Sequence, residues 1–73
     1  MLNEYCASTS NGQARAWLRD MRGSAENNWL CRQQGRPDRV IDMTAACVRE
    51  YGKGAVARYT DRNDLTSWRC FSR

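Results

Sequence analysis

Trp29-Leu30-Cys31 in the middle of the chain and Trp68-Arg69-Cys70 near its end share a Trp-x-Cys pattern. Each follows an earlier stretch that ends in cysteine, Leu2-Asn3-Glu4-Tyr5-Cys6 in the first half and Met43-Thr44-Ala45-Ala46-Cys47 in the second. Tryptophan and cysteine are rare residues, so a double match of this kind indicates an internal repeat. We predict a single domain, residues 1–73, made of two repeats at about 2–32 and 43–71.

The segments between these anchors can also be aligned. Gly12 matches Gly54 and Trp17 matches Tyr59 if a single-residue gap follows the first cysteine. A longer gap falls in the loop that comes next. On this alignment each repeat carries one aromatic residue at an equivalent position, followed by a polar loop.

Four cysteines in a short chain are typical of two disulfides formed in an oxidising compartment. If the two units share one structure, the simplest pairing lies within each unit, Cys6–Cys31 and Cys47–Cys70. A swapped pairing that joins the units remains open. A zinc site needs close cysteine pairs or histidines, and the sequence has neither, so we expect no metal and no cofactor.

The bridges compensate for a small core. Leu, Ile, Val and Phe account for only nine of the 73 residues. This share of about 12% is below the roughly 20% under which disorder is expected. In the chain-entropy model each bridge over a loop of about 25 residues adds roughly 3 kcal/mol. Trp29 and Trp68 share a strand face with the following cysteines, so we expect both indoles to pack on the bridges.

Local patterns predict an α+β fold of two helix-plus-hairpin repeats, with two helices packed on a small antiparallel sheet. Asn3 and Thr44 are suitable N-caps for helices over 3–9 and 44–51, and Gly52 is suited to the end of the second. Alternating or aromatic runs predict the strands, which are 14–18, 28–32, 39–41, 55–60 and 66–71.

Catalysis is not expected. The chain has no histidine, the commonest general base, and no thiol nucleophile remains if every cysteine is bridged. Asp61 and Asp64 are the nearest pair of carboxylates, but they lie in a predicted turn, where aspartate serves turn formation. We therefore predict a non-catalytic binding module.

Carbohydrate is the favoured ligand class, because sugar rings stack on aromatic side chains while polar groups bind the hydroxyls. Trp17 and Tyr59 are the candidate platforms, although packing in the core is the favoured interpretation for both. The polar loops that follow supply the remaining candidates, which are Asp20, Asn27, Asp61, Arg62, Asn63 and Asp64.

Two alternatives differ in the chemistry of the partner. The net charge of +4 is compatible with an anionic polymer at a cell surface, but the charges are scattered, so nucleic acid is not expected. A protein-directed role, as an inhibitor or toxin, is the other alternative. The oligomeric state is not indicated.

The chain resembles a family of small extracellular domains found in secreted proteins and receptor-kinase ectodomains of actinobacteria and other bacteria. The resemblance rests on 41–47, on Glu50-Tyr51-Gly52 and on the two Trp-x-Cys motifs. It implies an exported module without an established ligand. We expect no membrane span, since no apolar run is long enough, and a signal peptide that is absent from this sequence.

Overall fold

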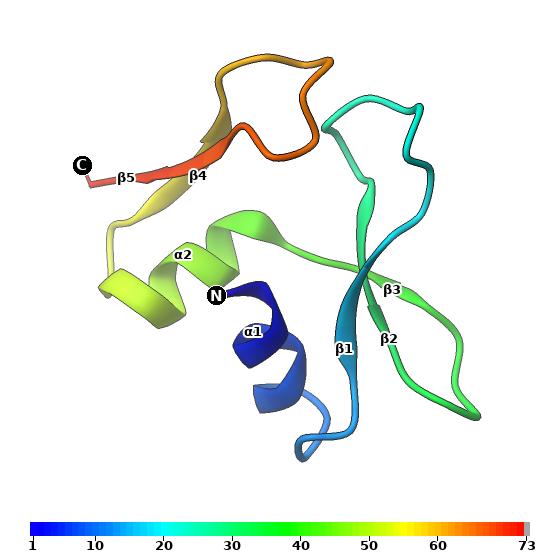
Figure 1. The fold of residues 1–73 in the computed structure, drawn as a ribbon. Helices are drawn as coiled ribbons and strands as arrows, with labels where there is room; N and C mark the ends of the chain where they lie inside the picture. Colours follow the sequence, from blue (N-terminus) through cyan, green and yellow to red (C-terminus); the bar gives the residue numbers. More distant parts are fainter. Residues whose placement is uncertain (73) are drawn as a thin grey trace.

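The computed structural model describes residues 1–72, and Arg73, the last residue of the expected domain, lies outside the described part. In chain order the elements are α1 (Leu2–Ser8), β1 (Arg15–Leu18), β2 (Trp29–Arg32), β3 (Arg39–Val40), α2 (Met43–Tyr51), β4 (Val56–Tyr59) and β5 (Trp68–Phe71). Each half thus contains a helix followed by an antiparallel hairpin (Figure 1). The α+β class expected from the sequence is confirmed.

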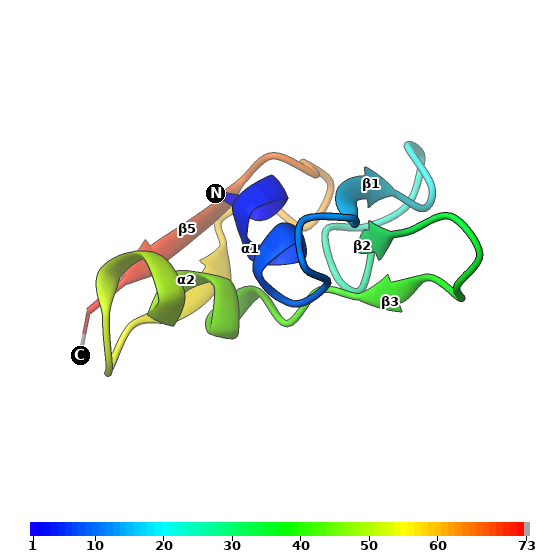
Figure 2. The ribbon, with the colours of Figure 1, turned by 90° about the horizontal axis from the view of Figure 1, so that it is seen from below.

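The strands form two small sheets, β1-β2-β3 and β4-β5, where one sheet was expected. β3 is only two residues long, and the chain enters α2 at Met43 directly afterwards, so β3 is too short to join the sheets. α1 packs against β1 and against α2, and therefore lies between the two halves (Figure 1). The molecule is thin, 36 × 30 × 13 Å, as Figure 2 shows.

The N-caps differ from those expected. Asp42 caps α2 in place of Thr44, and its Oδ1 accepts a hydrogen bond from the backbone N–H of Ala45 at 3.0 Å. α1 begins at Leu2, so Asn3 lies inside its first turn, and Met1 at the N-cap position makes no side-chain cap. Both predicted caps lie two residues too late. In α2 a second polar residue, Asp42, is an equally good cap by sequence criteria, and in α1 the helix begins without a polar cap.

The two mispredicted caps have another role. Asn3 Oδ1 accepts from the N–H of Ala16 at 2.9 Å, and Thr44 Oγ1 accepts from the N–H of Ala57 at 3.1 Å. In each unit a polar side chain of the helix therefore satisfies a backbone donor on the first strand of the hairpin. This bond holds the helix against its own hairpin.

The strand register corrects the alignment of the repeats. Ala16 lies opposite Cys31, and Ala57 lies opposite Cys70. Ala16 is consequently equivalent to Ala57, and Trp17 is equivalent to Arg58, not to Tyr59. The sequence alignment paired one aromatic residue with another. The positions relative to the cysteines show which residues are equivalent, and they require no gap after the first cysteine.

Both disulfides lie within a unit, Cys6–Cys31 and Cys47–Cys70, as the repeat predicted. Cys6 and Cys31 belong to the main buried cluster, together with Ala14, Ile41 and Met43. Small residues and sulfur thus form most of the core, in keeping with the scarcity of large aliphatic residues. Trp29 and Trp68 both pack against this cluster, and each remains half-buried. The cluster contains the bridge expected beside Trp29, but it does not contain the Cys47–Cys70 bridge expected beside Trp68.

The half-buried indoles join the two units reciprocally. Trp29 Nε1–H donates to the carbonyl of Leu65 at 3.0 Å, and Trp68 Nε1–H donates to the carbonyl of Ala25 at 3.1 Å. Each tryptophan therefore donates to a loop carbonyl of the other unit, so the two contacts are reciprocal. The loops over 19–28 and 60–67 meet at this contact (Figure 1).

Candidate binding sites

The carboxylates expected to bind a ligand also help to build the loops. Asp20 Oδ1 accepts from the N–H of Arg22 at 2.9 Å, and Asp61 Oδ1 accepts from the N–H of Asn63 at 2.9 Å. These are matching Asx turns at equivalent positions of the two units. The side chains are exposed, but one oxygen of each carboxylate is already engaged by the backbone.

Asp64 has a similar local role. Its Oδ1 accepts from the N–H and from the hydroxyl of Thr66, at 2.9 and 2.7 Å. These hydrogen bonds to the charged form lower the pKa of the Asp64 carboxyl. The turn interpretation of Asp61 and Asp64 therefore accounts for both residues without a ligand.

Two buried polar residues brace the loops and were not identified from the sequence. Asn28 Nδ2 donates to the carbonyls of Asp20 and Ser24, at 2.7 and 2.9 Å. Ser67 Oγ is the equivalent group and lies 2.8 Å from the carbonyls of Asp61 and Asp64. Both directly precede a Trp-x-Cys motif, and this shared position was the available signal.

The structure brings the two polar loops together on one surface. The N–H of Ala25 donates to the carbonyl of Arg62 at 2.7 Å, and Arg62 Nε lies 3.4 Å from Glu26 Oε1. Tyr59 donates its hydroxyl to the same Glu26 oxygen at 2.6 Å. Asn27, beside them, adopts a left-handed backbone at φ 52°. The loops were expected as two separate sites, and they form one internally bonded surface.

Tyr59 is therefore not a free platform. Its ring meets Trp68 edge-on, with 5.3 Å between ring centroids and an interplanar angle of 83°. The hydrogen bond to Glu26 favours the neutral phenol and raises the pKa of Tyr59. The packing of Tyr59 agrees with the core interpretation, and its role is to tie the two units together.

Trp17 behaves differently and contradicts the core interpretation. Its side chain is 53% exposed on the outer face of the β1-β2-β3 sheet. In register it lies opposite Leu30, which lies opposite Val40, so the three side chains form one row across the sheet. No partner within residues 1–72 accepts a hydrogen bond from the Trp17 indole N–H, unlike those of Trp29 and Trp68.

A fixed ion pair flanks this row. The guanidinium carbon of Arg32 lies 5.1 Å from the centroid of the Trp17 ring. Arg32 also donates two hydrogen bonds to the carboxylate of Asp38, at 3.1 and 2.9 Å. These bonds lower the pKa of Asp38 and raise that of Arg32. We call the row of Trp17, Leu30 and Val40, with this pair, the Trp17 face.

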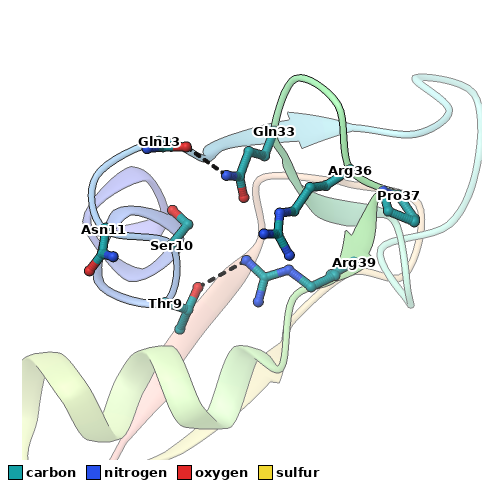
Figure 3. Close-up of a pocket in the computed structure, with 8 residues that line it drawn as sticks. All are labelled: Thr9, Ser10, Asn11, Gln13, Gln33, Arg36, Pro37 and Arg39. Atoms are coloured by element: carbon teal, nitrogen blue, oxygen red, sulfur yellow. Dashed lines mark hydrogen bonds between the residues drawn. The ribbon is translucent and has the colours of Figure 1, made fainter.

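A polar pocket opens on another part of the first unit, between the chain after α1 and the β2–β3 turn (Figure 3). Its volume is about 530 Å³. Its lining residues are polar or basic apart from one proline, and they are Thr9, Ser10, Asn11, Gln13, Gln33, Arg36, Pro37 and Arg39. We call it the Arg36/Arg39 pocket. The pocket is not evident from the sequence because its two walls are distant along the chain.

Two hydrogen bonds join the two walls of the pocket. Arg39 Nη2 donates to Thr9 Oγ1 at 3.1 Å, and Gln33 Nε2 donates to Gln13 Oε1 at 2.9 Å (Figure 3). The main chain of the two walls is held in place by the Cys6–Cys31 bridge, which joins α1 to β2, and by the pairing of β3 with β2.

Metal sites and membrane-spanning helices were also sought in the described part of the chain. Among residues 1–72, no three His, Cys, Asp or Glu side chains gather closely enough to hold a metal ion. No helix in that range has the length and apolar character required to cross a membrane.

Comparison of the chain with protein-family models, with curated proteins and with solved structures found no match. The expected likeness to small bacterial extracellular domains therefore has no support from these comparisons. The Trp17 face and the Arg36/Arg39 pocket are the two candidate binding sites.

Proposed function

We propose that this protein is a non-catalytic, extracellular binding module for a glycan, and that a sugar ring stacks on Trp17. The observation that carries the proposal is an indole 53% exposed on a sheet face, with its N–H unpaired among residues 1–72. An aromatic ring of this kind offers apolar area to the C–H groups of a sugar and one donor to a hydroxyl.

The surroundings of Trp17 suit such a ligand. Asp38 and Arg32 are bonded to each other, with the Arg32 guanidinium over one face of the ring, and they retain lone pairs and N–H groups toward solvent. A rigid aromatic group with prepositioned polar neighbours loses little conformational entropy on binding. The Cys31 bridge lies on the opposite face of β2 and helps to hold the sheet.

An extracellular location is part of the proposal. Two disulfides are typical of proteins that fold in an oxidising compartment. The platform is single, because the equivalent position in the second unit holds Arg58. A binding surface of one aromatic ring suits weak recognition of a repeating polymer, where many sites lie along one chain.

The test is retention of oxidised protein on insoluble neutral polysaccharides, at low and at high salt. Trp17→Ala is expected to weaken retention about tenfold, a loss of about 1.4 kcal/mol. Tyr51→Ala is the matched control, because Tyr51 is also an exposed aromatic residue, 70% exposed, on α2. Circular dichroism verifies that both variants remain folded.

Equal losses in the two variants would contradict the proposal, as would retention that disappears at high salt. The second outcome would show that charge and not stacking on Trp17 retains the protein, because electrostatic binding falls steeply with salt concentration.

A further inference from the structure

We propose that the Arg36/Arg39 pocket binds the oxyanion group of an acidic glycan, either a uronic acid carboxylate or a sulfate ester. This inference rests on the proposed glycan-binding function and adds the class of sugar and a second contact. The two oxyanions share the recognition chemistry of the guanidinium fork, whose paired N–H groups match two oxygens of one anion.

The position of Arg39 is fixed by its strand and by its partner. It pairs in β3 with Cys31, so it emerges on the face of the sheet that α1 covers. Its Nη2–H donates to Thr9 Oγ1, and the remaining N–H groups of the guanidinium have no acceptor among residues 1–72. Such a side chain is held in place and still has donors for a ligand.

Arg36 faces the same space from the neighbouring turn. Its backbone N–H donates to the carbonyl of Gln33 at 3.2 Å, which fixes the turn after β2. Figure 3 shows the guanidinium groups of Arg36 and Arg39 side by side, with Gln33 and Thr9 on either side. The Gln33–Gln13 bond leaves the Nε2 group of Gln13 as a further donor at the rim.

The charge in the pocket is uncompensated. No acidic residue lines it, and no carboxylate within residues 1–72 lies within salt-bridge distance of Arg36 or Arg39. Arg32 and Arg62, by contrast, each have an acidic partner. Two adjacent guanidinium groups repel each other, so an anion between them relieves that repulsion and gains charge-assisted hydrogen bonds.

The size of the pocket indicates a sugar carrying the anion. A volume of about 530 Å³ is larger than an isolated sulfate or carboxylate requires, and it falls in the range of small-molecule sites. The polar rim of amides and hydroxyls is suited to the hydroxyls of one acidic sugar residue. A smaller anion alone would leave most of the lining unused.

The site occurs once in the part of the chain that the structure describes. The second unit has no counterpart of β3 within residues 1–72, and the equivalent hollow is lined by Tyr51, Lys53, Ala55, Cys70, Phe71 and Ser72. That hollow holds a single cation and is more apolar. The segment over 33–40 therefore joins the two units and also supplies the two arginines.

The experiment titrates oxidised protein with four probes of equal length: an oligouronate, a sulfated oligosaccharide, a neutral oligosaccharide and single-stranded DNA. Arg36→Gln with Arg39→Gln is expected to weaken binding of the oligouronate, the sulfated probe or both at least about tenfold. Arg49→Gln with Arg58→Gln is the matched control, since it removes the same charge from exposed positions on α2 and β4. The control is expected to change affinity less than about threefold.

Arg39→Lys separates charge from geometry. Lysine keeps the positive charge but lacks the planar fork, so it is expected to recover less than half of the loss in binding free energy. All these side chains are exposed or half-buried polar groups, and near-ultraviolet circular dichroism reports whether the fold is unchanged.

Three results would overturn the inference: equal losses in the control, DNA binding as tight as that of the acidic sugars, or full recovery with Arg39→Lys. The neutral probe distinguishes this inference from the proposed function. If Trp17→Ala has no effect on the neutral probe while the arginine variants lose the acidic ones, the Trp17 proposal fails and the pocket stands. The converse pattern removes only the pocket.

Discussion

The two disulfides are expected to contribute unequally, although they close loops of nearly equal length. Removing each bridge by a paired substitution, Cys6→Ala with Cys31→Ala or Cys47→Ala with Cys70→Ala, tests this. The sequence separations are 25 and 23 residues. In the chain-entropy model each bridge then stabilises by about 3.5 kcal/mol, and the two differ by less than about 0.1 kcal/mol.

The two bridges differ in how deeply their sulfur atoms are buried, and this difference makes the expected losses of stability unequal. Cys6 and Cys31 are 0% and 3% exposed and lie in the main core cluster, whereas in the second pair only Cys47, at 1%, is enclosed and Cys70 is half-buried. Replacing two enclosed sulfurs leaves a cavity that costs a further amount of about 1–2 kcal/mol, and the second pair costs about half of that because water can fill the space at Cys70. We expect losses of about 5 kcal/mol for the first pair and about 4 kcal/mol for the second.

The measurement is urea unfolding followed by tryptophan fluorescence, with equal m-values required before midpoints are compared. A chain of 73 residues typically has a total stability of about 4–11 kcal/mol. Loss of Cys6–Cys31 therefore brings the protein close to unfolding, and an added osmolyte can restore a measurable transition. A second-pair variant that is as unstable as the first, or less stable, would refute the argument from burial.

Two further predictions concern the contact between the units. The folded-state pKa of Tyr59 is raised above its ordinary value, so the Tyr59–Glu26 bond stabilises the fold below about pH 10 and is lost as pH rises through the raised pKa. Glu26→Gln should lower the pKa of Tyr59 in an ultraviolet titration. An unchanged titration curve would show that the bond is not formed. Trp29→Phe and Trp68→Phe each remove one indole donor between the units. Each should lower the free energy of unfolding, measured in urea, by about 1 kcal/mol. A loss of stability in only one of the two variants would contradict the reciprocal arrangement.

The sequence determined the pattern of elements because that pattern depends on local chemistry. Paired Trp-x-Cys motifs predicted the repeat, and the repeat predicted the disulfides Cys6–Cys31 and Cys47–Cys70, which the structure confirms. The positions of helices and strands followed from residue preferences and alternation, with errors of one or two residues at Asn3 and Thr44. Local reasoning also identified Asp61 and Asp64 as residues of a turn.

Only the tertiary structure decided which side chains are free. Trp17 and Tyr59 look alike in the sequence, but cross-strand register places Trp17 on an open sheet face and Tyr59 against Trp68. Likewise, Arg36 and Arg39 are two of many arginines until the turn carries them to the chain that follows α1. Exposure and convergence depend on which distant segments pack together, and residue preferences carry no information about that packing.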